Sequence, residues 1–380
     1  MGRHGAGRHR LHVLRAVVDL TLPGAGHPGH RPDPQLPVRR DQARATRLDR
    51  EPMTGSRATP TMDAPPLLDI ENLAVGFRTG TEDASMPLQG VNLRVPRSSR
   101  MSLVGESGSG KSLTAAAVIG MLPEGAEILR GSIRLDGEEL LGASKRRLRD
   151  LRGPQIAIMF QNPRASLNPV LTVGGQIAEV IRTHSDAGRR DSHLRAIDLL
   201  DQMGVPDARR RAGDYVHQYS GGMAQRAALA MALSCQPDLL IADEPTTGLD
   251  ATLQQQVLEL VVEQVTDRGA SLLLITHDIA IARQTCERTA VMYAGRVMES
   301  GPTASVTSSP ANPYTTALLR AFATVDEGRM YAIPGTVPTL LDPLVECPFA
   351  SRCPEVGEEC RDGVPELRTI ADREVACVKA

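Results

Sequence analysis

The chain has 380 residues, of which 41% are hydrophobic and 23% charged, and its formal net charge at pH 7 is −2. This length allows one large domain or two unequal ones, and the near-neutral charge gives no reason to expect a nucleic-acid partner. No apolar run approaches the roughly 18 residues that span a bilayer, so any association with a membrane is expected through a partner or a peripheral face.

The first segment, residues 1–62, differs in composition from the rest of the chain. It is rich in Arg, Pro, Gly and His and has no sustained periodicity, which predicts a disordered extension. The favoured interpretation is a dispensable extension or a start site placed too early, since Met53 and Met62 precede the first ordered segment. A targeting or interaction arm is the alternative, because an Arg-rich, acid-poor start is typical of transit peptides.

From residue 63 to about 300 the pattern indicates one α/β domain. Short apolar strands alternate with helical stretches, and strands that are apolar on both faces favour a sheet covered by helices on its two sides. Residues 164–232 are predicted to be mostly helical. After about residue 301 the chain becomes Pro-rich and then Cys-rich, which predicts an appended tail over residues 301–380 rather than a continuation of the sheet.

The strongest local signal is the segment GESGSGKS, which follows an apolar strand and precedes a helix-forming run. It matches the phosphate loop G-x-x-x-x-G-K-[ST], in which successive backbone N–H groups converge on phosphate oxygens at a helix N-terminus. Lys111 would reach the β- and γ-phosphates, and the Ser112 hydroxyl would hold Mg²⁺. The segment predicts ATP binding by Gly105, Glu106, Ser107, Gly108, Ser109, Gly110, Lys111 and Ser112.

Polar residues at the ends of three further apolar strands supply the rest of a phosphoryl-transfer site. Asp243 would steady the Mg²⁺ shell, and Glu244 is placed to polarise a water molecule for attack on the γ-phosphate. Gln161 could bring its carboxamide to the metal or to the water, and His277 could contact the γ-phosphate. The sequence therefore predicts catalytic roles for Glu244, His277, Lys111 and Gln161, with Mg²⁺ held by Ser112, Gln161 and Asp243.

The segment YSGGMAQR (219–226) resembles the signature motif of the ATP-binding subunits of ABC transporters, although Tyr219 stands where Leu is common. The resemblance spans about residues 67–300. It implies a phosphate-loop core with an antiparallel β subdomain and a helical signature subdomain. It also implies that Phe77 stacks on adenine, and that Ser220, Gly221 and Gly222 contact a second nucleotide, bound by an opposite subunit. Asp250 falls in the family's D-loop and is expected among the nucleotide-binding residues.

Two further segments and the tail resemble the oligopeptide and dipeptide importers. These are QNPRASLNPVLTVGGQI (161–177) and SPANPYTTALLRA (309–321), where Asn312 replaces the usual His. The resemblance implies an ATPase at the cytoplasmic face of the membrane, working with a second ATPase, two permease subunits and an external solute-binding protein. A nickel or other small-solute importer is one alternative, and a non-transport ABC protein acting on ribosomes or DNA is a remote one.

Four of the six cysteines fall in the tail, at Cys347, Cys353, Cys360 and Cys377. The spacing matches neither the common zinc pattern nor the bacterial ferredoxin run, so spacing alone leaves zinc, an iron–sulfur cluster and free thiols open. Resemblance to the peptide-importer tails implies a 4Fe–4S cluster, with zinc less favoured. Its role would be structural or regulatory, because nothing in the sequence places it near the ATP site.

Overall fold

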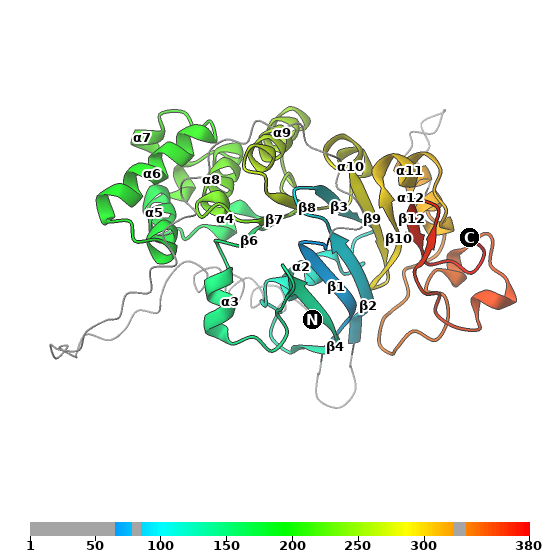
Figure 1. The fold of residues 1–380 in the computed structure, drawn as a ribbon. Coiled ribbons are helices and arrows are strands. Elements are labelled where there is room, and N and C mark those ends of the chain that lie inside the picture. Colours follow the sequence, from blue (N-terminus) through cyan, green and yellow to red (C-terminus); the bar gives the residue numbers. More distant parts are fainter. Residues whose placement is uncertain (1–64, 78–84, 323–331) are drawn as a thin grey trace, which may run out of the picture.

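The computed structural model describes residues 65–77, 85–322 and 332–380, so the extension expected over residues 1–62 lies outside the described residues. The described strands form two sheets that lie side by side, with helices packed between and around them (Figure 1). None of the helices in these ranges is both long and apolar enough to span a bilayer.

The smaller sheet is antiparallel and built mainly from the beginning of the chain. Burial alternates at the start of its central strand, where Leu68 and Ile70 are buried and Asp69 is half-buried, as expected for a strand with one face on the core. Asn72, with φ of 48°, lies at a register shift in the same strand. The strands, in spatial order, are β2 (Ser85–Val95), β1 (Leu68–Phe77), β4 (Ala126–Leu135) and β5 (Glu138–Glu139).

The larger sheet carries the predicted site, and its strands are parallel from β6 to β9. Both faces are buried: Leu239 and Ile241 of β7 pack into a core shared with the smaller sheet, whereas Leu240 and Ala242 pack into a core shared with helices. In spatial order the strands are β11 (Arg368–Ile370), β12 (Arg373–Val375), β10 (Arg296–Pro302), β9 (Arg288–Tyr293), β3 (Arg100–Val104), β8 (Ser271–Thr276), β7 (Leu239–Asp243) and β6 (Ile156–Met159).

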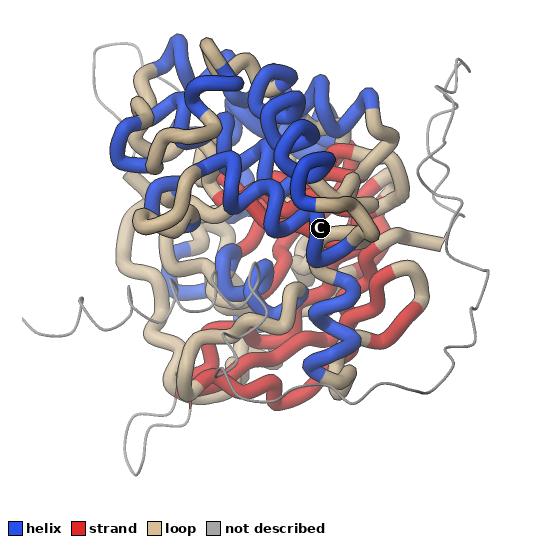
Figure 2. Tube along the Cα trace, turned by 90° about the vertical axis from the view of Figure 1, so that its left-hand side faces the viewer, coloured by secondary structure: helices blue, strands red, loops and turns tan. Residues whose placement is uncertain are grey.

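A group of helices fills the chain between β6 and β7 and lies at the end of the molecule away from the C-terminus (Figure 1). In Figure 2, which is seen from that end, helices fill the upper part of the molecule and strands the lower part. Its core is made of Ala, Leu, Val, Ile and Met side chains with one aromatic residue, Tyr219. The Tyr219 hydroxyl donates a hydrogen bond to the Arg211 carbonyl at 2.9 Å, so this larger residue is accommodated where Leu is common. The helices are α4 (Pro163–Ser166), α5 (Val173–His184), α6 (Arg189–Gln202), α7 (Ala208–Arg211) and α8 (Gly221–Leu233).

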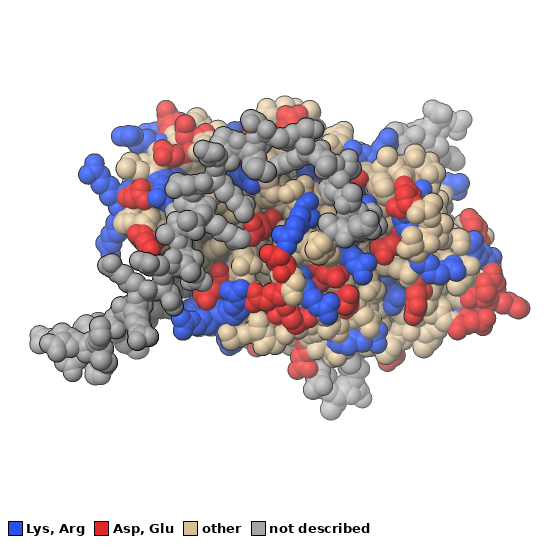
Figure 3. Space-filling model, in the orientation of Figure 1, with Lys and Arg blue, Asp and Glu red and all other residues tan. Residues whose placement is uncertain are grey.

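The remaining helices connect neighbouring strands or cover the larger sheet. On the face drawn in Figure 3, acidic and basic side chains are interspersed. The helices are α2 (Lys111–Val118), α3 (Lys145–Leu151), α9 (Ala251–Asp267), α10 (Ile279–Thr285), α11 (Thr303–Ser308) and α12 (Pro313–Phe322).

The tail continues the larger sheet, and the expectation that it would not do so is wrong. β12 pairs antiparallel with β10, and β11 pairs with β12, so the end of the chain adds a hairpin to the sheet. The hairpin is fixed by buried polar groups as well as by Val375, which is fully buried. The fully buried carboxylate of Glu299 in β10 accepts hydrogen bonds from the Asn312 backbone and from Arg373 of β12. The Asn312 side chain donates to the carbonyls of residues 298 and 376 and so joins β10 to the tail.

Candidate functional site

The phosphate loop connects β3 to α2 and can form only with glycine at two of its positions. A Cβ atom at Gly105 would lie 2.1 Å from the carbonyl oxygen of Met292, and Gly110 precedes α2 with φ of 105°. The first backbone N–H groups of a helix have no partner inside the helix. The loop and the first turn of α2 therefore offer N–H groups to an anion.

Lys111 is 6% exposed, and its ammonium group is held by the loop itself. Nζ donates to the carbonyl oxygens of Gly105 and Glu106, both at 2.9 Å, and contacts Ser109 Oγ at 3.3 Å. Burial lowers the pKa of Lys111, and the acidic groups of Glu244, Asp243 and Glu106 partly offset this effect. The ammonium group is thus prepositioned beside the loop, within reach of a phosphate bound there.

Ser112 and Asp243 bring two oxygen atoms together beside the loop. The Ser112 hydroxyl donates to Asp243 Oδ1 at 3.0 Å, which joins the start of α2 to the end of β7. Burial raises the pKa of Asp243 to about 6, and the neighbouring Glu244 raises it further, while Ser112 and Lys111 act in the opposite direction. A hydroxyl and a carboxylate in contact are oxygen donors of the kind that Mg²⁺ binds.

Glu244 follows β7 and lies at the centre of a polar group contributed by three strand ends. Its φ is 46°, a left-handed conformation, and its backbone N–H donates to the Ile275 carbonyl of β8 at 2.9 Å. The carboxylate accepts hydrogen bonds from Gln161 Nε2 at 2.7 Å and Thr247 Oγ1 at 2.9 Å. His277 Nδ1 lies 3.2 Å from its other oxygen.

Two opposing effects act on the protonation of the Glu244 carboxylate. Burial alone would raise its pKa, but the hydrogen bonds from His277 and Thr247, together with the charge of Lys111, lower the pKa below its ordinary value. Glu244 is therefore ionised at neutral pH and able to accept a proton or orient a water molecule.

The remaining predicted nucleotide contacts lie outside this polar group. Ser220 and Asp250 are exposed caps of α8 and α9, and their side chains accept hydrogen bonds from Met223 N and Leu253 N. Phe77 ends β1 in the smaller sheet, next to residues outside the described ranges. Within the described residues, no recorded hydrogen bond connects the phosphate loop with Phe77, Ser220, Gly221, Gly222 or Asp250.

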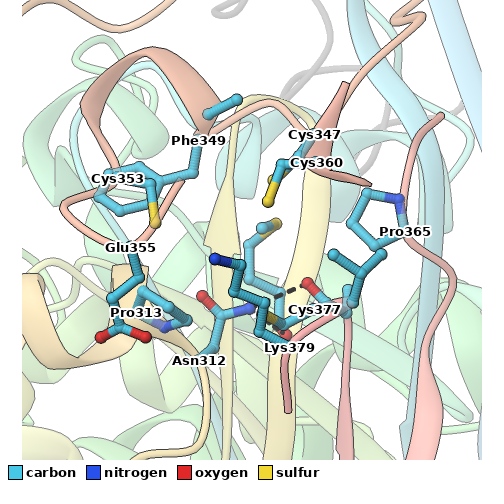
Figure 4. A pocket seen from close by; sticks show the side chains of 14 residues that line it. Asn312, Pro313, Cys347, Phe349, Cys353, Glu355, Cys360, Pro365, Cys377 and Lys379 are labelled. Carbon is cyan, nitrogen blue, oxygen red and sulfur yellow. Dashed lines mark hydrogen bonds between the residues drawn. The ribbon is translucent and has the colours of Figure 1, made fainter. Parts of the chain in front are cut away.

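The four tail cysteines come together although they are separated in sequence. Cys347, Cys353, Cys360 and Cys377 line one pocket that is partly open to solvent (Figure 4). All four are free thiols. In the part of the chain that the structure describes, no three Cys, His, Asp or Glu side chains are close enough together to hold a single metal ion.

Sequence reasoning missed two contacts to the site. Thr247, three residues after Glu244, donates to its carboxylate, and a hydroxyl in the turn after a strand-end acid is the signal that could have indicated it. Arg352, between Cys347 and Cys353, forms a bidentate ion pair with Glu106 of the phosphate loop, with N–O distances of 2.9 and 3.1 Å. The expectation that nothing places the cysteine segment near the ATP site is therefore wrong.

Two known families match the chain in adjacent regions. Residues 88–247 match the family described as ABC transporter. Residues 298–360 match the family described as oligopeptide/dipeptide transporter, C-terminal region. The first match contains the phosphate loop and Glu244, and the second contains three of the four tail cysteines.

Curated relatives are similar over most of the chain. A protein of Sinorhizobium fredii named "Probable peptide ABC transporter ATP-binding protein" is 43% identical, over 80% of this chain and 92% of that protein. The Escherichia coli "Probable D,D-dipeptide transport ATP-binding protein" is 43% identical, over 82% and 95%. The oligopeptide transport ATP-binding protein of Mycobacterium tuberculosis is 43% identical, over 83% of this chain and 52% of that longer protein.

Solved structures of similar fold cover about two thirds of the chain. A dimeric ATP-binding cassette in a post-hydrolysis state with ADP and Pi is 25% identical, with a TM-score of 0.56 over 62% of this chain and 98% of that one. A Clostridium perfringens protein that is part of an ABC transporter complex is 26% identical, with a TM-score of 0.55 over 65% and 92%.

Proposed function

Because this chain belongs to the ATP-binding proteins of peptide ABC transporters, we propose that it binds and hydrolyses ATP to drive the import of di- or oligopeptides. The observation that carries the proposal is the polar group in which Lys111, Ser112, Asp243 and Glu244 meet beside a phosphate loop. This group has the cation, the metal-binding oxygens and the carboxylate that phosphoryl transfer to water requires.

The loop and its neighbours would bind the triphosphate and its metal ion. The N–H groups of residues 105–112 hold phosphate oxygens, and Lys111 moves from the loop carbonyls to the β- and γ-phosphates. Ser112, Asp243 and Gln161 are the residues that would hold Mg²⁺, whose charge neutralises the phosphate oxygens when it is bound. The contact between the Ser112 hydroxyl and Asp243 supports this assignment, because the two oxygens already lie 3.0 Å apart.

Glu244 is the proposed general base. Its ionised carboxylate orients a water molecule toward the γ-phosphate and accepts the proton that the water loses. His277 and Gln161, which now contact this carboxylate, would turn toward the γ-phosphate and the water when nucleotide binds. Lys111 and His277 stabilise the charge on the transferred group.

The second half of each site would come from another subunit. We assign Phe77 to the adenine of the chain's own nucleotide. Ser220, Gly221, Gly222 and Asp250 would serve the nucleotide held by the opposite ATPase. Ser220, Gly221 and Asp250 are exposed at the starts of α8 and α9, which supports this assignment, because exposed N–H groups there can meet phosphate on a partner. Gly222 is buried behind them.

The assembly would lie at the membrane. Residues 63–300 form the ATPase domain, and the helical part at residues 164–232 transmits dimer closure to two permease subunits. The chain then works peripherally on the cytoplasmic side, with a second ATPase and an extracytoplasmic solute-binding protein.

A detergent-solubilised pull-down of the tagged chain from its own membranes tests these partners. Recovery of two permeases and a second ATPase is expected. Recovery of nickel-transport permeases would contradict the proposal that the cargo is a peptide. Recovery of ribosomal or DNA-bound proteins without a membrane component would contradict the proposed role in transport.

For the tail we propose a 4Fe–4S cluster held by Cys347, Cys353, Cys360 and Cys377. The four thiols that line one pocket fit this group, because each thiolate of such a cluster bonds a different iron and the sulfurs need not converge on one point. A single tetrahedral zinc ion, with Zn–S bonds of about 2.3 Å, would require them to converge. Anaerobic purification should give about four irons and about four sulfides per chain. Stoichiometric zinc, or no metal at all, would contradict the assignment.

A further inference from the structure

The strongest contact between the tail and the ATP site is made by Arg352, at the end of a short 3-10 helix (Ala350–Arg352) between two of the cysteines. Its side chain is 3% exposed. Both terminal nitrogens bond the Glu106 carboxylate, and the pair spans 246 positions of sequence. A buried bidentate pair of this kind fixes both partners in position and orientation.

The guanidinium group uses all five of its N–H donors. Besides the two bonds to Glu106, it donates to the Tyr293 hydroxyl at 3.2 Å and to the carbonyl oxygens of Ile333 and Pro334 at 3.2 and 2.9 Å. It also lies 5.6 Å from the centre of the Tyr293 ring. Lysine has three donors and no planar fork, so it could not reproduce this set.

Glu106 is held from three sides. Its N–H donates to the Tyr314 hydroxyl at 3.1 Å, its carbonyl accepts from Lys111, and its carboxylate is paired with Arg352. The second residue of the phosphate loop is therefore fixed by α12, by the loop lysine and by the cysteine segment together.

An aromatic cluster supports the contact. Tyr293, Tyr314 and Phe349 have ring centroids 4.4 to 5.4 Å apart, in a chain with only nine aromatic residues. Phe349 comes from the cysteine segment, Tyr314 from α12 and Tyr293 from β9. The packing of these rings keeps Arg352 against the loop.

The Glu106–Arg352 pair affects how favourably the loop can bind a negatively charged triphosphate. Glu106 places a carboxylate in a loop whose ligand is a polyanion, and like charges at short range oppose binding most strongly where solvent is limited. The Glu106 side chain is only 26% exposed, so the positive charge of Arg352 is its main neutralising partner.

We propose that Arg352 is a positioning residue for ATP binding: it neutralises and orients Glu106, and thereby connects the four-cysteine segment to the phosphate loop. The inference rests on the proposed ATP binding at this loop. Without Arg352, the Glu106 carboxylate faces the triphosphate uncompensated. The loss is expected in ATP affinity rather than in the hydrolysis step, because Glu244 and its partners do not contact Arg352.

The test is a double-mutant cycle on the full chain, with the Kd for ATP and the KM and kcat of hydrolysis as readouts. Arg352→Gln is expected to raise the Kd and KM about tenfold, equivalent to about 1.4 kcal/mol, with kcat within about twofold of the parent. Adding Glu106→Gln to this variant should recover most of the affinity, since the uncompensated charge is then removed. A purely structural role for Arg352 predicts no such recovery.

Arg373→Gln is the matched control, because Arg373 is also a tail arginine paired with a buried glutamate but lies on the hairpin, at Glu299. It is expected to lower the melting temperature and leave the Kd for ATP unchanged. An equal loss of affinity in both arginine variants, or no recovery in the double variant, would overturn the proposal. A parent chain that fails to bind ATP would instead refute the proposed function, and a folded Arg352→Gln variant with parental affinity would refute only this inference.

Discussion

At the scale of single residues, Glu244 shows how the site balances burial against hydrogen bonding. Burial would raise the pKa of this carboxylate, but the hydrogen bonds from His277 and Thr247 outweigh that effect and lower the pKa below its ordinary value. For Asp243, one residue earlier, burial is the larger effect and raises the pKa to about 6, although the Ser112 hydroxyl donates a hydrogen bond to it. The two adjacent acids thus differ in the direction of their pKa shifts, because burial and hydrogen-bond donors act on them in different proportions.

Replacing His277 is predicted to move the acid limb of the pH profile of kcat/KM upward, because that profile reports the pKa values of the nucleotide-free enzyme, in which His277 contacts Glu244. His277 lowers the pKa of Glu244, so in His277→Ala the carboxylate takes up a proton at a higher pH and loses its function as a base sooner as pH falls. Thr247→Val removes another donor without removing the imidazole and should shift the limb in the same direction. A pH–rate profile in which neither variant moves the limb would refute the role of these hydrogen bonds.

Sequence reasoning located Asp243, Glu244, Gln161 and His277 because each ends or follows an apolar strand. Lys111 was located by the phosphate-loop motif, and the roles of all five residues stay predictions. Arg352 could not be found, because its partner Glu106 is 246 residues away and no local pattern marks the pairing of a tail arginine with the loop.

At the scale of elements, a buried ion pair holds the hairpin of β11 and β12 against the edge of the larger sheet. Strands of three residues are too short for an alternating pattern to appear, so the sequence indicated a tail outside the sheet. The structure instead fills the edge of β10 with this hairpin, and Glu299 beneath it is fully buried and paired with Arg373.

Removing Arg373 is predicted to destabilise the fold strongly. Arg373→Ala leaves the Glu299 carboxylate buried without its cation, and the free energy of unfolding should fall by about 3–5 kcal/mol. Arg97→Ala is the control, since Arg97 and Asp136 are both about half exposed and such pairs contribute roughly 0–1 kcal/mol. Urea unfolding followed by circular dichroism measures the free energy of unfolding of both variants. Equal decreases in the two variants would contradict the claim that burial makes the Arg373–Glu299 pair important for stability.

At the scale of the whole molecule, the phosphate loop and the signature segment begin helices in different parts of the chain. The loop precedes α2, which packs into the core shared by the two sheets, whereas Ser220 begins α8 in the helical part at the opposite end from the tail (Figure 1). The tail reaches back to the start of the fold, where Gln89 of β2 bonds backbone atoms of residues 342 and 344. In the proposed assembly, one chain would present half of each site.

Blocking the signature segment is predicted to impair hydrolysis of the ATP that is bound by the opposite subunit rather than by this chain. In the assembly purified from membranes, Ser220→Arg should lower ATP turnover at least about tenfold, because the anion nest for the opposite nucleotide is lost. Photolabelling of this chain by an ATP analogue should persist. Ser308→Arg, at an exposed serine of α11, is the control and should leave turnover unchanged. Parental turnover in Ser220→Arg would contradict the shared site.

The central claim is that this chain hydrolyses ATP with Glu244 as the base, and phosphate release by the purified assembly tests it most directly. We predict turnover in the parent that requires Mg²⁺, and a decrease of about 10²- to 10⁴-fold in Glu244→Gln with ATP still bound. Turnover that is unchanged by this substitution, or absent from the parent assembly, would contradict the account.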